Sequence, residues 1–184
     1  LAILLSKEGH DVTGIDLTNS MIKEAKITAS DYNVSPTFIQ MDAQSTSFAD
    51  DTFDVIVTRN LTWTLPDPQA AYMEWHRILK KGGILLNFDA DYAENIRNHH
   101  QKASYISASD IYGHCGITSE LEKENNDITL SMPCSVHHRP DWDLKLIKAA
   151  GFSQYTTDKN LGKKVLLEHD LDDAPLFLIY AEKS

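Results

Sequence analysis

The chain has 184 residues and a formal net charge of −10, with 42% apolar and 24% charged residues. This size and balance fit one globular domain with a real core and exclude disorder of the whole chain. The acidic charge disfavours nucleic acid and anionic membranes as partners, and no apolar run approaches the ~18 residues of a membrane-spanning helix.

The cysteines and histidines indicate neither a disulfide framework nor a metal site. Cys115 and Cys134 form no metal-type pair, so we expect free thiols and a reducing, cytoplasmic location. The histidines include adjacent pairs at 99–100 and 137–138. Neighbouring side chains point in different directions, so such pairs chelate poorly and we predict no bound metal.

Helical and strand patterns alternate over the first half of the chain. The pattern predicts a helix over 1–7, a strand over 10–16, a helix over 18–30, strands over 36–41 and 53–58, a helix over 67–80 and a strand over 84–88. Strand 53–58 is nearly all apolar, which is typical of a strand buried on both faces. This alternation predicts an α/β fold: a doubly wound, Rossmann-like, mostly parallel sheet with helices on both faces.

The second half departs from this rhythm. Residues 92–140 are polar and histidine-rich, and we interpret them as an irregular insertion or lid within a single domain over 1–184. A helix over 141–150 follows and ends at Gly151. Strand patterns at 152–168 and 175–183 predict an antiparallel hairpin at the edge of the sheet.

The chain begins with Leu1-Ala2-Ile3-Leu4-Leu5, which has no methionine and no helix cap. These residues are typical of the interior of a helix, so we expect further sequence upstream, including a strand of the sheet.

Polar residues follow the predicted strands at the positions where ligands bind in α/β sheets. They are Asp16, Asp42, Thr58-Arg59-Asn60 and Asp89. A carboxylate after an early strand can accept hydrogen bonds from both hydroxyls of a ribose. The alternative for each acid is a helix cap or a solvated turn.

Four stretches together resemble class I S-adenosylmethionine-dependent methyltransferases of the type 11/25-like, small-molecule branch, which includes enzymes of ubiquinone and menaquinone biosynthesis. The matching stretches, in the order of the family's motifs, are residues 9–25, 40–43, 53–68 and 77–85. The resemblance implies in-line methyl transfer from S-adenosylmethionine to a small-molecule acceptor.

The resemblance also implies roles for single residues. Asp16 would bind the ribose, while Leu17 and Met21 would pack on the adenine, although Met21 fits the core of its helix better. The adenine edge would be read by Asp42, Ala43 and Gln44. The methionine part would lie near Arg59, Asn60 and Leu61.

Residues facing the substrate are implied less specifically. They are Trp63, Asp89, Asp91 and Tyr92; the last three are candidate general bases, with caps or solvated acids as the alternative, and no catalytic residue is assigned. The lid would select the acceptor through Tyr105, Tyr112, His114, His137, His138 and Trp142.

One family motif has no match here. The family carries a glycine-rich loop before the matched region, yet none of the eight glycines forms a G-x-G pattern. Two alternatives therefore stay open, a non-catalytic methyltransferase-like binding module and an NAD-dependent oxidoreductase. Methylation of nucleic acid is disfavoured by the charge and by Thr58-Arg59-Asn60-Leu61, where such enzymes carry an Asn-Pro-Pro-Tyr-type sequence.

Overall fold

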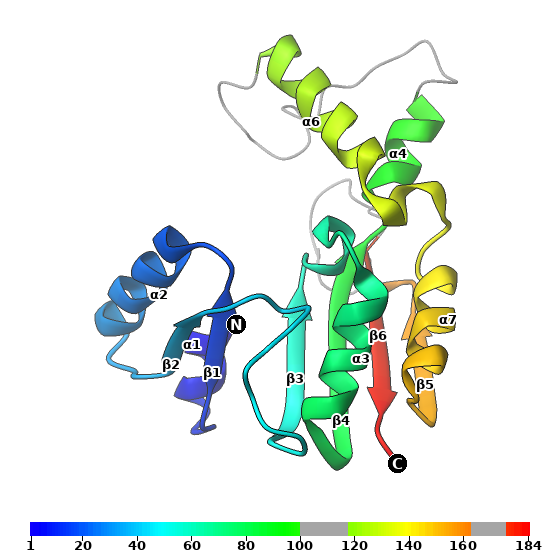
Figure 1. Ribbon diagram of the computed structural model, residues 1–184. Coiled ribbons are helices and arrows are strands. Elements are labelled where there is room, and N and C mark those ends of the chain that lie inside the picture. Colours follow the sequence, from blue (N-terminus) through cyan, green and yellow to red (C-terminus); the bar gives the residue numbers. More distant parts are fainter. Residues whose placement is uncertain (100–117, 163–175) are drawn as a thin grey trace. The chain divides into compact units, whose positions relative to one another are not determined.

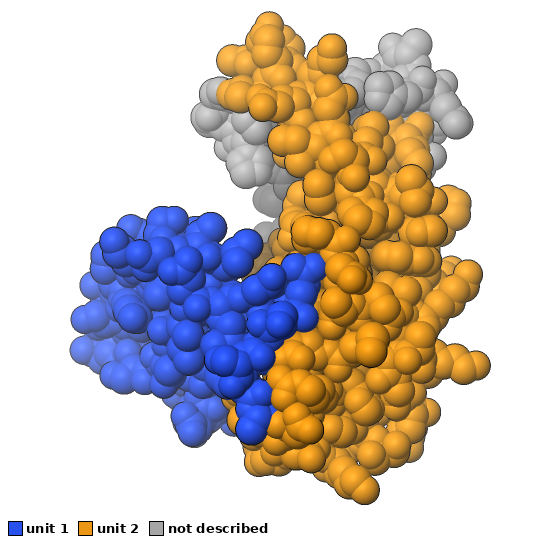
Figure 2. All heavy atoms as spheres, viewed as in Figure 1, with its two compact units in different colours: residues 1–49 blue, residues 50–184 orange. Residues whose placement is uncertain are grey.

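A computed structural model describes residues 1–99, 118–162 and 176–184. The chain divides into two compact units, Leu1–Ala49 and Asp50–Ser184, which are coloured separately in Figure 2. The single domain expected over 1–184 stays a prediction. No described helix is long and apolar enough to cross a membrane.

The first unit is a small α/β assembly. Its elements are α1 (Ala2–Lys7), β1 (Thr13–Asp16), α2 (Asn19–Asp31) and β2 (Thr37–Gln40) (Figure 1). The two strands pair in parallel, from Thr13 opposite Thr37 to Asp16 opposite Gln40. Gly9, with φ of +88°, follows α1 and has the left-handed conformation that glycine tolerates best. All four predicted elements of this unit are confirmed.

Helix α2 buries a narrow stripe. Ile22 and Ala29 lie seven residues apart, which returns them to the same face after two turns, and both are at most 5% exposed. Met21 is 56% exposed, so the interpretation of this side chain as helix core is wrong. Its position is rotated by about 100° from Ile22, which carries it off the buried stripe.

The second unit contains a four-stranded sheet in the order β3-β4-β6-β5. Its strands are β3 (Phe53–Arg59), β4 (Leu79–Ala90), β5 (Gln154–Asp158) and β6 (Leu176–Glu182). Strands β3 and β4 run in parallel, whereas β6 pairs antiparallel with both β4 and β5. The α/β fold class and the antiparallel strands at the C-terminus are therefore confirmed.

Helices and helical turns complete the second unit. They are η1 (Thr62–Thr64), α3 (Pro68–Ile78), α4 (Tyr92–His99), α6 (Ser119–Ser131), η2 (Pro133–Val136) and α7 (Asp141–Ala150) (Figure 1). Asp67 caps α3 by accepting from the N–H of Ala70 at 3.0 Å, and Pro68 occupies the first turn as predicted. Helices α3 and α7 pack against each other, and their buried side chains include Tyr72, Trp75 and Ile147.

Two predictions about β3 and α3 are wrong. Strand β3 is not buried on both faces, because it is an edge of its sheet and Val55 is 47% exposed. Helix α3 ends at Ile78 rather than Lys80, because the fully buried Leu79 starts β4 and pairs with Phe53. A bulge then carries the chain through Gly82, whose φ is +72°.

The segment predicted to be irregular, 92–140, is mostly helical where it is described, in α4, α6 and η2. Asp91 caps α4 by accepting from the N–H of Glu94 at 3.1 Å, and Thr118 caps α6 by accepting from the N–H of Leu121 at 3.3 Å. These local caps favour helices in a stretch whose apolar periodicity is weak. The lid residues Tyr105, Tyr112 and His114 lie outside the described residues, as does Cys115.

Candidate functional site

In the first unit, the two predicted nucleotide-binding acids lie at the same edge of the sheet. Asp16 ends β1 and lies opposite Gln40, which ends the neighbouring parallel strand β2. Asp42 follows two residues after Gln40. The main-chain N–H of Met41 donates to the carbonyl of Asp16 at 3.0 Å, and the Gln40 side chain donates to the carbonyl of Leu17 at the same distance. These two bonds hold the ends of the strands together.

Only one oxygen of the Asp16 carboxylate accepts hydrogen bonds from described residues. Its Oδ1 accepts from the N–H of Thr18 at 2.8 Å and from the Thr18 hydroxyl at 2.6 Å, which is the turn that the alternative interpretation expected. No described residue donates to its Oδ2. The neighbouring Leu17 is 66% exposed. An exposed apolar side chain next to an available carboxylate oxygen suits a nucleoside, whose base is flat and whose ribose donates.

Asp42 orients the residues that follow it. Its Oδ1 accepts from the N–H of Gln44 at 2.8 Å and from the Gln44 side-chain amide at 3.1 Å. Ala43 lies between them and, like Asp42 and Gln44, is partly buried. The turn therefore presents a short stretch of ordered backbone next to β2.

In the second unit, the predicted residues after β3 lie opposite the end of β4. Asn60 adopts a left-handed conformation with φ of +51° and donates its N–H to the carbonyl of Phe88 at 2.8 Å. The side chains of Arg59 and Asn60 are exposed, while Leu61 is partly buried. Asn60 is among the residue types that tolerate this conformation, which turns the chain from β3 toward η1.

Asp89 lies in a buried polar network rather than in solvent. Its side chain is enclosed by η1 and the start of α7 and is 1% exposed. It accepts from the hydroxyl of Thr62, from the N–H of Trp63 at 3.0 Å and from Arg139 at 3.3 Å. This network attaches η1 to the end of β4.

Arg139 is the centre of this network. Its side chain is 1% exposed and donates to both oxygens of Asp143, at 2.7 and 2.9 Å, and to the hydroxyl of Thr62 at 2.6 Å. Tyr72 donates to Asp143 at 2.8 Å and accepts from Asn87 at 3.0 Å. Nearly every polar atom in the cluster is therefore paired, as buried charges require.

Burial and charge shift the ionisation of this cluster. Burial raises the pKa of Asp89 above its ordinary value, against the opposing charge of Arg139. Burial also raises the pKa of Tyr72, and the nearby carboxylate of Asp143 adds to this shift. Burial disfavours the charge of Arg139, but the hydrogen bond to Asp143 and the charges of Asp143 and Asp89 together outweigh it, so the pKa of Arg139 rises.

Asp91 and Tyr92 lie directly beyond β4. The carboxylate of Asp91 accepts from the N–H of Glu94 at 3.1 Å, from the N–H of Arg139 at 3.1 Å and from the Arg97 guanidinium at 3.3 Å. Asp91 thus has the role of a helix cap, which was the alternative considered for it. The Tyr92 ring lies 4.7 Å from the Trp63 ring, with a tilt of 52°.

Sequence reasoning missed the buried network apart from Asp89. Its other members are Thr62, Tyr72, Asn87, Arg139 and Asp143. Asn87 offered a signal, because it is an amide inside the otherwise apolar run Ile84–Phe88. Arg139 and Asp143 offered another, because opposite charges four residues apart at a helix start can pair.

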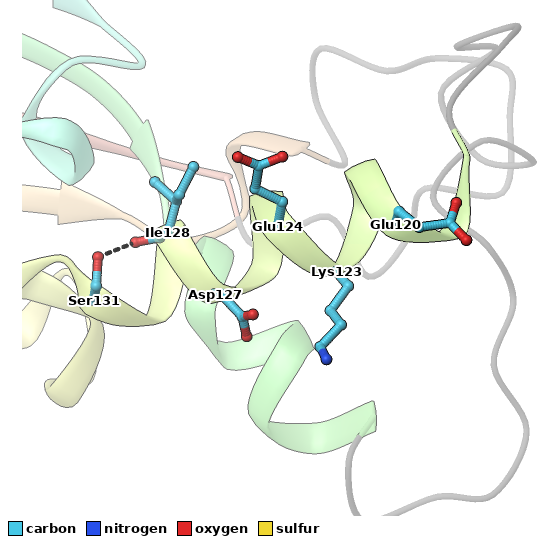
Figure 3. A pocket seen from close by; sticks show the side chains of 6 residues that line it. All are labelled: Glu120, Lys123, Glu124, Asp127, Ile128 and Ser131. Carbon is cyan, nitrogen blue, oxygen red and sulfur yellow. Dashed lines mark hydrogen bonds between the residues drawn. The ribbon is translucent and has the colours of Figure 1, made fainter.

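A shallow hollow along α6 does not resemble a binding site. Its lining side chains project from one helix, as Figure 3 shows: Glu120, Lys123, Glu124, Asp127, Ile128 and Ser131. The only hydrogen bond drawn there runs from the Ser131 hydroxyl to the carbonyl of Ile128. Within the described residues, no group of His, Cys, Asp and Glu could hold a metal ion. His137 instead stacks on Trp142, with ring centroids 4.4 Å apart.

Comparison with known proteins finds a family match over the first part of the chain. Residues 1–87 match the family model described as a methyltransferase domain. The matched range contains β1, β2, β3 and most of β4, and thus the strand ends that carry Asp16, Asp42 and Asn60.

Two of the individual relatives that match this chain are methyltransferases by name. A phosphatidylethanolamine N-methyltransferase of Cereibacter sphaeroides is 35% identical over 74 residues, which are 39% of this chain and 36% of that protein. A demethylmenaquinone methyltransferase of Desulfitobacterium hafniense is 31% identical over 91 residues, which are 48% of this chain and 36% of that protein. The matched region thus spans about a third of these relatives.

Solved structures show the same fold. A SAM-dependent methyltransferase of Methanosarcina mazei superimposes with a TM-score of 0.64 and 22% identity, covering 100% of this chain and 86% of that one. This superposition covers the whole chain, so the similarity in fold extends beyond residue 87.

Proposed function

We propose that this protein transfers a methyl group from S-adenosylmethionine to a small-molecule acceptor. The observation that carries the proposal is the pair Asp16 and Asp42 at the ends of neighbouring parallel strands, inside the region that matches the methyltransferase domain. This is the edge at which open α/β sheets bind ligands.

The residues of the first unit fit the nucleoside part of this cofactor. The Oδ2 atom of Asp16 is available to accept from ribose hydroxyls, and Leu17 offers an exposed apolar surface to the adenine. Asp42, Ala43 and Gln44 would read the adenine edge. Met21 is exposed on α2, four residues after Leu17, and would close the adenine pocket.

The second unit would contact the rest of the cofactor and the acceptor. Arg59, Asn60 and Leu61 would line the methionine part, and Trp63, Asp89, Asp91 and Tyr92 would face the acceptor. When bound, S-adenosylmethionine supplies an electrophilic methyl group on its sulfonium. The protein then mainly has to align the acceptor and exclude water. A site held by the buried network around Asp89 is well suited to this.

Two features support a small acceptor. The relatives named above act, by their names, on phosphatidylethanolamine and demethylmenaquinone. The net charge of −10 would repel a nucleic-acid backbone.

The test is calorimetric titration of S-adenosylhomocysteine into the full-length protein and its Asp16→Asn variant. We expect affinity to fall about ten- to hundredfold, because charged hydrogen bonds contribute roughly 1.5–3 kcal/mol. Asp11→Asn is the matched control, since Asp11 is an exposed acid of the same unit, and it should bind normally. An unchanged affinity for Asp16→Asn would remove Asp16 from the site.

Absence of binding to the wild-type protein would instead reject the cofactor. Titration with NAD would then test the oxidoreductase alternative. Binding of S-adenosylhomocysteine without methyl transfer to any acceptor would favour the non-catalytic binding module.

A further inference from the structure

The main chain of Trp63 is held from two sides. Its N–H donates to Asp89 at 3.0 Å, and its carbonyl accepts from the Sγ atom of Cys134 at 3.1 Å. Asp89 is itself fixed by the network around Arg139. The ring packs on Tyr92 at 4.7 Å. The backbone of Trp63 is therefore fixed by two hydrogen bonds, and its ring packs against Tyr92.

One atom of this well-anchored residue has no partner. The indole Nε1 is buried, and no described residue accepts its hydrogen. A buried donor without an acceptor costs free energy, so such groups are few in folded proteins. Those that persist in ordered positions are candidates for ligand contacts.

The other polar groups nearby already have partners. Trp63 lines a narrow hollow together with Ala90, Asp91, Tyr92, Ala93, Thr129, Cys134, Ser135 and Arg139. The Thr129 hydroxyl donates to the carbonyl of Asn125 at 2.8 Å, and the Ser135 hydroxyl donates to the carbonyl of Thr129. Asp91 and Arg139 are paired as described above. The hollow is thus lined by two aromatic residues and two alanines, and one of these aromatic residues, Trp63, carries the unpaired indole N–H.

We propose that the indole N–H of Trp63 donates a hydrogen bond to an oxygen of the methyl acceptor. Trp63 is then a specificity-determining residue, and the acceptor is a small molecule that carries a hydrogen-bond-accepting oxygen beside a flat apolar part. This inference rests on the proposed function, because it takes the bound small molecule to be the acceptor. The hollow is too narrow for a ligand as it stands, so the proposed binding requires the partly buried Tyr92 ring to move aside.

The test follows the indole N–H directly by NMR of the ¹⁵N-labelled full-length protein saturated with S-adenosylhomocysteine. The signal lost in Trp63→Phe identifies Trp63, and the phenyl ring preserves the packing. Benzamide and benzoate serve as probes with an acceptor oxygen, and benzylamine serves as a matched probe that is a cation with donors only.

We expect benzamide and benzoate to move the Trp63 signal downfield and benzylamine to leave it in place. Trp63→Phe should weaken benzamide binding about five- to tenfold, as for the loss of one neutral hydrogen bond. Tyr155→Phe is the control, because Tyr155 is an exposed aromatic residue of β5 and is no part of the hollow, and this variant should bind benzamide normally.

Two results would overturn the inference. One is a Trp63 signal that already has the downfield position of a bonded indole and does not move with any probe. The other is unchanged benzamide affinity in Trp63→Phe. Cofactor binding is measured separately by the calorimetric titration, and the probe titrations are repeated without S-adenosylhomocysteine, so a failure of the proposed function is distinguished from a failure of this contact.

Discussion

The two units of this chain differ sharply in how much they bury. In residues 1–49 the only buried apolar side chains are Ile22 and Ala29, and all of β1 is partly exposed. In residues 50–184 the described core includes Tyr72, Leu79, Leu85, Ile147 and Ile179, each 0% exposed. The residues proposed to bind the cofactor and those proposed to face the acceptor therefore have very different structural support.

This contrast has a physical basis in the sheets. A two-stranded sheet is marginally stable alone, and parallel strands are usually covered on both faces. Strands β1 and β2 have four residues each, whereas β4 has twelve and pairs on both sides. We infer that Asp16 and Asp42, which are proposed to bind the cofactor, are held mainly by local turns. Asp89, which is proposed to face the acceptor, is held by the buried core of the second unit.

The substitution Arg139→Met tests the role of burial in the second unit with the largest expected effect. It leaves Asp89 and Asp143 buried without their cation, so we expect a loss of about 3–5 kcal/mol in the free energy of unfolding. Urea denaturation measures it. Lys159→Met is the control, since it breaks an exposed ion pair with Asp141, which lies on α7 like Asp143. This variant should lose at most about 1 kcal/mol in the free energy of unfolding. Equal losses in the two variants would show that burial of the network is unimportant.

Truncation of apolar side chains in the two units should give a similar contrast. Leu85→Ala removes a fully buried side chain and should cost about 2–5 kcal/mol. Leu17→Ala changes an exposed side chain and should alter stability by no more than about 0.5 kcal/mol. Chemical denaturation measures both. A large loss for Leu17→Ala would mean that the first unit buries this side chain in solution.

Hydrogen exchange would sharpen the comparison residue by residue. We expect the amides of β1 and β2 to exchange at least about tenfold faster than the paired amides of β4, because opening a small, thinly buried unit costs less free energy. Mass spectrometry of the peptides covering 13–40 and 79–90 measures this. Added S-adenosylhomocysteine should slow exchange in 13–40 if it binds there, and equal protection of both peptides would contradict the contrast.

The smallest expected effect is a pH dependence from His76. Burial lowers its pKa below 6.5, aided by Lys183, so the folded state favours the neutral ring while the unfolded chain takes up a proton near pH 6.5. Its stabilising contribution is therefore full above pH 6.5 and is lost as pH falls through the lower folded pKa. Unfolding of His76→Gln, followed from pH 7.5 to 5, should show a shallower fall than wild type, and parallel curves would exclude His76.

Much of the fold was predictable because its signals are local. The helix ending before Gly9, the strand ending at Asp16 and the helix ending at Gly151 all follow from short patterns of apolar and turn residues. The C-terminal antiparallel pair followed from two adjacent strand patterns. The end of α3 was misplaced, because Leu79 suits either a helix or a strand and only its pairing with Phe53 decides.

The candidate site was likewise predictable in part from local sequence patterns and in part not. The sequence by itself determined which acids follow strands, because Asp16, Asp42 and Asp89 stand next to the apolar runs that form them. Only the tertiary structure decided that Asp89 is enclosed, that Met21 is exposed and that Arg139 joins η1 to β4. The enclosure of Asp89 and the link from η1 to β4 depend on contacts between residues far apart in the sequence, such as Asp89 with Arg139, which no local pattern encodes.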